Sequence, residues 1–238
     1  MKILLIGYGK MGKTIERIAK ERGRQIAHII DIHNRGDLQH ITGKDVDVAI
    51  EFTQPESAFD NIYACISNGV PVISGTTGWL DRKPEIEEYC RQKGGAFFYA
   101  SNFSIGVNIF FKINRFLAQI MKGFAEYDVR IEEIHHTEKK DAPSGTAITL
   151  AEDILKHLDR KKRWVKETPN EADDLAIASK REKDVPGVHT VSYFSLADDI
   201  EIKHTAHSRE GFALGAVLAA EWIVGKKGVF TMDDYLRI

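Results

Sequence analysis

A regular alternation of short apolar runs and helix-like segments occupies the first hundred residues and constrains the fold more than any other feature. Strands that alternate with helices form βαβ units, whose crossovers produce a parallel sheet. The predicted strands are 2–7, 25–31, 45–53, 70–78 and 96–104, and the predicted helices are 13–23, 55–69 and 84–95. We therefore expect an α/β domain with a parallel sheet over residues 1–104.

The pattern changes after residue 104. Consecutive strands without intervening helices indicate a mixed or antiparallel sheet. The second half predicts helices at 105–121 and 146–158, strands at 127–136, 188–196 and 199–207, and a charged, loop-rich stretch at 160–186. We expect a C-terminal α+β domain over 105–209. An apolar helix in the closing segment, 210–238, is expected to pack back on the first domain.

Composition excludes several classes of protein. The chain has 238 residues and a formal net charge of −2, so no overall field attracts nucleic acid or an anionic membrane. No apolar run approaches the roughly 18 residues of a membrane span. Cys65 and Cys90 lie in helix-like segments without CxxC spacing, which favours buried, inert thiols. We expect a cytoplasmic protein with neither nucleic acid nor membrane as a partner.

The turn GYGKMG, residues 7–12, matches G-x-G-x-x-G between the first strand and the first helix. Gly7 would permit the tight turn, Gly9 the approach of a pyrophosphate, and Gly12 close packing of helix and strand. The helix N-terminus offers free N–H groups to phosphates. This context predicts a Rossmann-type domain that binds NADH or NADPH, and a glycine-rich turn that binds nothing is the alternative.

Cofactor preference stays open at this stage. Asp31 ends the second strand, where a carboxylate accepts from ribose hydroxyls and repels a 2′-phosphate, which favours NAD. Lys10, His33 and Arg35 are nearby and would tolerate NADP. The turns 75–78 and 101–103 also follow strands, and ligands of open α/β sheets bind beyond the carboxyl ends of strands. We expect both turns at the cofactor crevice, although either is also compatible with an ordinary turn.

Residues 135–147, HHTEKKDAPSGTA, place titratable and cationic side chains directly before a predicted helix. Ser144 is a plausible N-cap, and the backbone N–H groups of Gly145 and Thr146 would form an anion cradle. Lys139 adds charge, as does Arg209 in a second loop. The group favours a small substrate with more than one carboxylate.

Two other interpretations of this stretch compete. A zinc site would draw on His135, His136, Glu138 and Asp141, but their spacing fits no common tetrahedral pattern. A solvated charged loop is the second alternative. We predict no metal, because the cluster stands before a helix N-terminus in a chain that also carries the glycine turn.

Taken together, HH-x-x-K-x-DAPSGTA, G-x-G-x-M-G, GTTG and NFS-[IV]-GVN resemble the 4-hydroxy-tetrahydrodipicolinate reductase family, also called dihydrodipicolinate reductases, of lysine and diaminopimelate synthesis. The resemblance extends from residue 6 to about residue 220. Lys10 stands where this family commonly has Arg. The resemblance implies nicotinamide-dependent reduction of a cyclic imine, and a homotetramer assembled through the sheet of the second domain.

The resemblance also implies roles for individual residues. His135 is expected to be the proton donor, with Lys139 as its partner. The substrate carboxylates are expected at His136, Lys139, Ser144, Gly145 and Thr146. The cofactor is expected at Gly7, Tyr8, Gly9, Lys10, Met11, Gly12, Asp31, Gly75, Thr76, Thr77, Ala100, Ser101, Asn102 and Phe103.

Two further functions compete with the reductase. One is another two-domain NAD(P)-dependent oxidoreductase, acting on a small carboxylated imine or carbonyl, or a sugar, which need not have DAPSGTA. The other is a nucleotide-sensing protein without catalysis. A sensor needs the crevice but no proton donor, so His135, Lys139 and Arg209 argue against it.

Overall fold

The computed structural model describes residues 1–208 and 210–237. They form two compact units. Unit 1 comprises Met1–Ile105 and Glu210–Ile238, and unit 2 comprises Gly106–Arg209. The chain therefore leaves unit 1 at the start of one helix and returns to it at the start of another.

Unit 1 is built on a parallel sheet with the strand order β11-β5-β4-β3-β1-β2. The strands are β1 (Lys2–Ile6), β2 (Gln25–Ile30), β3 (Val48–Glu51), β4 (Val72–Ser74), β5 (Ala96–Tyr99) and β11 (Gly228–Phe230). The predicted parallel sheet is confirmed. The closing segment adds β11 as an edge strand that the sequence did not predict, because three residues are too few to show a period.

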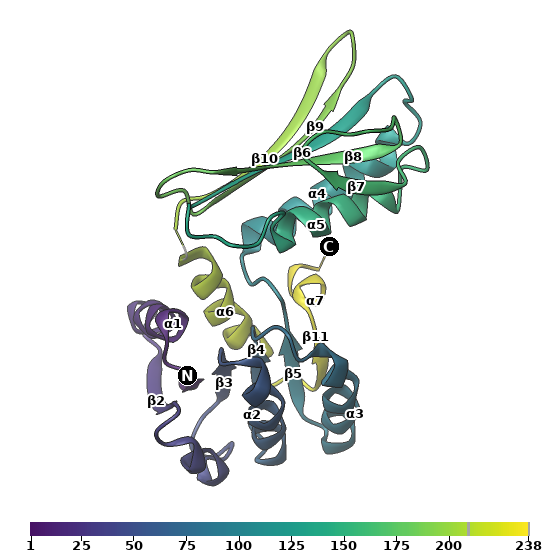
Figure 1. Cartoon of the computed structure of the whole chain (residues 1–238). Helices are drawn as coiled ribbons and strands as arrows, with labels where there is room; N and C mark the ends of the chain where they lie inside the picture. The colour runs from purple at the N-terminus through teal and green to yellow at the C-terminus, as the bar shows by residue number, and fades with distance from the viewer. Residues whose placement is uncertain (209, 238) are drawn as a thin grey trace. The chain divides into compact units, whose positions relative to one another are not determined.

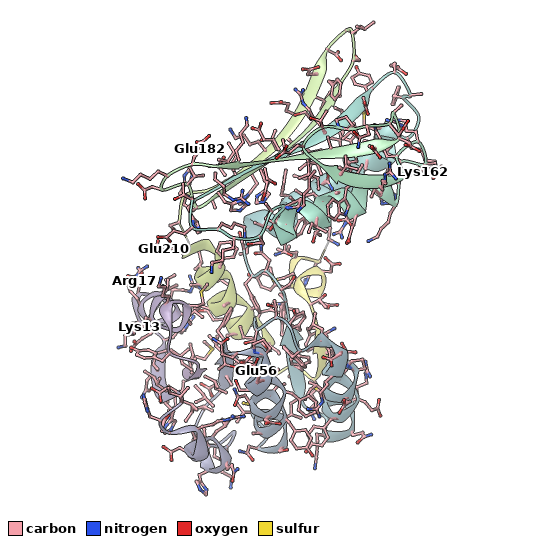
Figure 2. The ribbon with its side chains drawn as sticks, in the orientation of Figure 1. Lys13, Arg17, Glu56, Lys162, Glu182 and Glu210 are labelled. Atoms are coloured by element: carbon pink, nitrogen blue, oxygen red, sulfur yellow. The ribbon has the colours of Figure 1, made fainter. Side chains whose placement is uncertain are left out.

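Helices cover both faces of this sheet (Figure 1). They are α1 (Lys10–Glu21), α2 (Pro55–Ser67), α3 (Lys83–Lys93), α6 (Glu210–Ile223) and α7 (Met232–Leu236), with 3₁₀ turns η1 (Arg35–His40) and η2 (Leu80–Arg82). Leu5 packs in the cluster with α1 and α6, and Leu4 packs in the cluster with α2 and α3, since neighbouring strand residues point to opposite faces. An ion pair between Arg17 and Glu210, both labelled in Figure 2, ties α6 to α1.

Unit 2 contains a mixed sheet with the order β10-β9-β6-β8-β7. The strands are β6 (Asp128–His135), β7 (Arg163–Lys166), β8 (Asp174–Arg181), β9 (Gly187–Phe194) and β10 (Asp199–Ala206). The central strand β6 pairs antiparallel with β9 and parallel with β8, so the predicted mixed sheet is confirmed. Helices α4 (Ile105–Met121) and α5 (Gly145–Leu155) lie against one face of it (Figure 1), where Phe110, Ile131 and Leu150 share the core.

The prediction that 160–186 is loop-rich is wrong, because this stretch holds β7 and β8. Strand β8 lies between β6 and β7 and pairs with both in parallel. Its sequence, DLAIASKR, is apolar only in the middle, and Lys180 and Arg181 at its end hide the alternation that marks a strand. Arg181 contacts the buried Glu133, as described below.

Two expectations from composition concern burial and membranes. Both thiols are free and buried, Cys65 on α2 and Cys90 on α3, as the sequence predicted. In the portion of the chain that the structure describes, no helix combines the length and apolar character needed to cross a bilayer.

Candidate active site

Each of the three glycines in the turn of unit 1 is surrounded differently, and these surroundings show why a side chain is absent there. Gly7 has φ +95°, and a Cβ there would lie 1.9 Å from the carbonyl oxygen of Phe52. A Cβ on Gly12 would lie 2.2 Å from the carbonyl oxygen of Gly7. A Cβ on Gly9, the N-cap of α1, would meet no protein atom within 4 Å. Gly7 and Gly12 thus permit the fold of the turn, whereas Gly9 leaves open space for a ligand.

This open space is part of a cavity of about 420 Å³ at the carboxyl ends of β1, β2 and β3. Its lining includes Gly7, Tyr8, Gly9, Asp31, His33, Arg35, Phe52, Thr53 and Asn61. The Asp31 Oδ1 atom accepts from the His33 N–H at 2.8 Å, which fixes the carboxylate at the end of the second strand. Acidic and cationic side chains therefore meet in one cavity. Lys10 and Met11 follow in the first turn of α1, where Lys10 is exposed.

The two other predicted turns approach the same region through Phe52. A Cβ on Gly75 would lie 2.2 Å from the Phe52 ring, and the Phe103 ring centroid lies 5.7 Å from that of Phe52. Thr76 is buried, and its Oγ1 accepts from the Thr53 N–H at 2.8 Å. The remaining predicted positions in these turns are Thr77 and Ser101, which are exposed, Ala100, which is buried, and Asn102, which accepts from the Ser104 N–H.

Glu51 is a functional candidate that the sequence reasoning missed. It ends β3 with no exposed surface and accepts from Ser74 Oγ at 2.6 Å, Thr76 Oγ1 at 2.9 Å, and the N–H and hydroxyl of Thr53. Burial raises the pKa of Glu51, and the surrounding hydroxyl and amide donors oppose that rise. The carboxyl group joins the ends of β3 and β4. An acidic residue that ends the buried run VAIE was the available signal.

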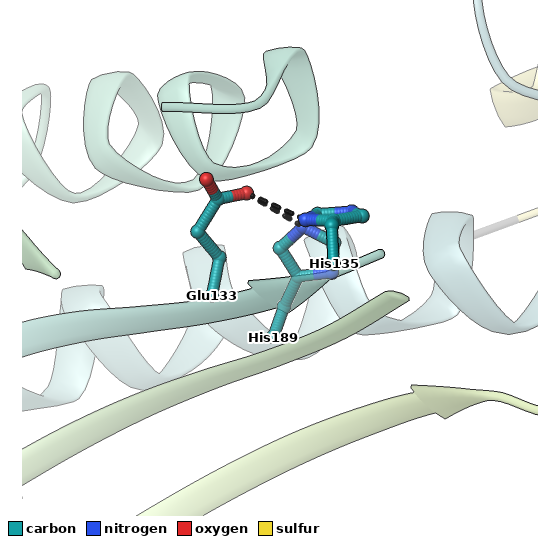
Figure 3. A group of neighbouring side chains, drawn as sticks. All are labelled: Glu133, His135 and His189. Carbon is teal, nitrogen blue, oxygen red and sulfur yellow. Dashed lines mark ion pairs between the residues drawn. The ribbon is translucent and has the colours of Figure 1, made fainter. Parts of the chain in front are cut away.

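In unit 2, a second buried cluster lies on the helix-covered face of the sheet (Figure 3). Glu133 and His135 are two residues apart on β6 and so share a face, and His189 stands opposite Glu133 on β9. His135 Nδ1 lies 3.0 Å from Glu133 Oε2, and His189 Nε2 lies 3.9 Å from the same oxygen. Ser144 Oγ lies 3.0 Å from His189 Nε2. The predicted His135 and Ser144 are therefore joined through two residues that the sequence did not single out.

The electrostatics of the cluster keep one carboxylate charged and one imidazole neutral. Burial alone would raise the pKa of Glu133, but hydrogen bonds from His135, Ser144 and Ser179 together hold that pKa well below its usual value. Burial lowers the pKa of His189 to about 3, and the neighbouring His135 adds to the effect. Glu133 is thus ionised and His189 neutral at physiological pH.

The loop before α5 ends in the N-cap that the sequence predicted. Ser144 is the N-cap of α5 and accepts from the Ala147 N–H at 3.2 Å. Gly145 is exposed, and the first N–H groups of a helix have no acceptor within it. The Lys139 Nζ atom donates to both carboxylate oxygens of Asp141 at 2.8 Å, which lowers the pKa of that acid.

The zinc set that was weighed as an alternative is not what the structure brings together. His135 is grouped with Glu133 and His189, whose candidate ligand atoms lie within 4.8 Å of one another, rather than with His136, Glu138 or Asp141. The positive charge beside Glu133 already comes from Arg181, whose guanidinium lies 3.3 Å from Oε1. We interpret the group as a buried carboxylate held between this guanidinium and the two imidazoles. Arg209, also predicted at the site, lies outside the described residues.

Unit 1 has a six-stranded parallel sheet with a glycine-rich turn of the kind that binds phosphates, and unit 2 is an α+β unit with a buried histidine cluster. This combination defines the class of two-unit dinucleotide-binding proteins. Family models described as "Dihydrodipicolinate reductase, N-terminus" and "Dihydrodipicolinate reductase, C-terminus" match residues 1–103 and 106–236. The chain belongs to the dihydrodipicolinate reductase family.

Individual relatives cover almost the whole chain. A protein named 4-hydroxy-tetrahydrodipicolinate reductase from Christiangramia forsetii is 52% identical over 99% of this chain and 98% of its own length. A protein of the same name from Archaeoglobus fulgidus is 37% identical over 96% of each chain. Among solved structures, the dipicolinate-bound dihydrodipicolinate reductase from Paenisporosarcina sp. TG-14 has a TM-score of 0.77 at 21% identity, with 98% of each chain covered, which shows the shared fold.

Proposed function

We propose that this protein reduces the cyclic imine 4-hydroxy-tetrahydrodipicolinate to tetrahydrodipicolinate with NADH or NADPH, in the synthesis of diaminopimelate and lysine. The observation that carries the proposal is the full-length similarity to proteins named for this reaction, 52% in one case. A likeness in fold to a probable dehydrogenase from Thermotoga maritima, at 10% identity, does not favour another substrate.

The glycine turn of unit 1 fits a dinucleotide cofactor. The space in front of Gly9 and the N-terminus of α1 suit a pyrophosphate, and Asp31 in the same cavity suits a ribose. When bound, the nicotinamide supplies hydride to an electrophilic carbon of the imine ring. We assign the remaining cofactor contacts to Tyr8, Lys10, Met11 and Gly12 and to the turns 75–77 and 100–103.

The helix start in unit 2 fits a dicarboxylate substrate. The N–H groups of Gly145 and Thr146 offer directional donors to one carboxylate. Lys139 would exchange Asp141 for a substrate carboxylate, and His136 and Arg209 complete the proposed set. Because the Ser144 hydroxyl already contacts Ala147 and His189, we assign it chiefly to shaping this cradle.

His135 is the proposed proton donor. Hydride addition leaves an electron-rich ring that needs one proton, and a positioned histidine is the side chain that most often serves as the general acid for such a transfer. Its Nδ1 faces the ionised Glu133, so Nε2 is the nitrogen that delivers the proton. Lys139, held on the following loop, would bind the carboxylate beside the reacting carbon.

A coupled assay tests the function. The purified protein is mixed with pyruvate, aspartate semialdehyde and the upstream synthase, and the loss of NADH or NADPH absorbance is followed. Consumption that requires the synthase is expected. If the protein binds a cofactor but consumes neither, the proposed substrate is wrong. The alternative function, another NAD(P)-dependent oxidoreductase, would then be favoured.

A single substitution tests the assigned acid. His135→Gln is expected to lower turnover by roughly 100-fold or more while the Kd for NADH or NADPH stays within about twofold, because a general acid contributes about 10²–10⁴ to the rate. An equal loss of cofactor affinity would contradict the role.

Assembly and location are part of the same proposal. The sheet of unit 2 has one face that its own helices leave open, with a hollow of about 610 Å³ lined by Arg130, Glu132, Thr190 and Phe194 among others. We propose that four copies assemble through this sheet in the cytoplasm. Light scattering during gel filtration should give four times the chain mass of 26.8 kDa.

A further inference from the structure

Arg181, the last residue of β8, connects parts of the proposed substrate site that lie far apart in sequence. Its guanidinium donates to Glu133 Oε1 at 3.3 and 3.4 Å, to the carbonyl oxygen of Asp141 at 2.6 Å, and to that of Lys139 at 3.3 Å. One planar, forked side chain therefore links a buried carboxylate on β6 to the backbone of the loop that carries Lys139. Lysine, with a single nitrogen, cannot make this set of contacts.

Glu133 connects the same arginine to His135. One carboxylate oxygen contacts Arg181, and the other lies 3.0 Å from His135 Nδ1. A Cβ on Gly187 would lie 3.1 Å from His135 Nε2, so the absence of a side chain there leaves this nitrogen uncovered by residue 187. The carboxylate thus holds the ring by one nitrogen, and the glycine keeps a side chain away from the other.

We propose that Glu133 and Arg181 act together as positioning residues for the reduction. Glu133 fixes the orientation and the protonated Nδ1 of His135, and Arg181 holds both Glu133 and the Lys139 loop. The proton donor and the carboxylate-binding lysine thereby keep a fixed spacing. This inference rests on the proposed function, and neither residue needs to touch the substrate.

If Glu133 and Arg181 have these positioning roles, substituting each should affect kcat and substrate binding differently. Glu133→Gln removes the carboxylate that orients the His135 ring, but Arg181 still holds the loop that carries Lys139. We therefore expect kcat to fall by about 10- to 100-fold, which is less than for loss of the acid itself, with little change in KM. Arg181→Lys releases the loop as well. It should weaken binding of dipicolinate, a planar dicarboxylate, measured by calorimetry, by about tenfold and lower kcat too.

A double-mutant cycle separates positioning from a general structural role. If Glu133 acts through His135, then Glu133→Gln added to His135→Gln should lower kcat by less than about twofold further, because the two residues act as a unit. If the double variant loses the product of the two single losses, Glu133 acts independently and the inference is overturned.

Matched controls come from the other end of β8. Asp174, its first residue, is also buried and paired with an arginine, since Arg163 Nε lies 2.7 Å from its carboxylate. Asp174→Asn and Arg163→Lys remove or alter the same kind of pair in the same unit. Both should leave kcat within about twofold. If they lower it as much as the Glu133 and Arg181 variants do, the effect is loss of unit 2 stability, and the positioning role is refuted.

A readout without turnover keeps this inference separate from the proposed function. In protein labelled with ¹⁵N-histidine, the ring nitrogens of His135, assigned with His135→Gln, should show Nδ1 protonated in the wild type and a mixed tautomer in Glu133→Gln. An unchanged spectrum would overturn the positioning role even if turnover is normal. If the spectrum changes but the protein consumes no NADH or NADPH, the positioning of His135 by Glu133 is supported and only the proposed substrate is refuted.

Discussion

Acidification should destabilise unit 2 through His189, by an amount that follows from the lowered pKa of this residue. Burial lowers this pKa from 6.5 to about 3, so the folded state keeps the ring neutral while the unfolded state protonates it. Between pH 6.5 and pH 3 the unfolded state binds the extra proton, and stability falls as the pH falls. The loss is about 1.4 kcal/mol per pH unit once the pH is below the unfolded-state pKa of 6.5. Between pH 7 and pH 5 the free energy of unfolding therefore falls by about 2 kcal/mol.

The assay compares the wild type with His189→Gln, which cannot titrate but keeps a polar group near Ser144. Urea unfolding at pH 7 and pH 5 is followed by pulse-labelling hydrogen exchange of peptides from β9 and β10. The wild type should lose about 2 kcal/mol more than the variant on acidification. The nearby Glu133 has a lowered pKa, so its contribution is lost only further into acid and leaves this window undisturbed.

An equal pH dependence in the two proteins would refute the reasoning. It would mean that His189 already carries a proton in the folded state, or that its surroundings admit water. His204, whose pKa burial also lowers, is present in both proteins, so its contribution cancels in the difference. The difference in pH dependence between the wild type and His189→Gln is therefore specific to His189.

Three further outcomes test other parts of the structure. Gly9→Ala should leave stability unchanged and weaken NADH or NADPH binding by about tenfold or more, whereas Gly12→Ala should also cost about 1–3 kcal/mol in urea unfolding, because its Cβ would lie 2.2 Å from a carbonyl oxygen. Asp31→Ser should raise the ratio of NADPH to NADH affinity in fluorescence titrations, and an unchanged ratio would argue against a contact with the ribose. Cys65 should resist a thiol reagent until the protein unfolds, because burial raises the pKa of its thiol.

The sequence predicted helices and strands best where the spacing of apolar residues agrees with the residues that begin or end an element. The helix expected at 105–121 begins and ends at those residues, and the βαβ order of the first hundred residues gave the parallel sheet. It failed at 160–186, where β8 is stabilised by pairing with two neighbours rather than by its own alternation. Strand β11 likewise depends on pairing with β5, a partner distant in sequence. Long-range pairing overrides local propensity at both places.

For the site, local motifs indicated the groups on loops and missed the groups beneath them. The glycine turn and the Ser144 cap are contiguous signals, and the structure gives each its predicted local form. Glu133 was visible in principle, because the alternation of β6 puts it on the same face as His135. Arg181 and His189 were not visible, since only the strand order brings β8 and β9 to either side of β6.

Two of the buried carboxylates, Glu51 and Glu133, show why a residue's type does not determine its chemistry. Glu51 meets only hydroxyl and amide donors, and burial raises its pKa. Burial also acts to raise the pKa of Glu133, but hydrogen bonds from His135, Ser144 and Ser179 hold that pKa below its usual value, and the Arg181 guanidinium lies 3.3 Å from the same carboxylate. The difference lies in partners that each strand acquires from its neighbours, β4 in unit 1 and β8 and β9 in unit 2. Arg181 is the cation that the adjacent strand β8 places 3.3 Å from Glu133, beside the proposed proton donor His135.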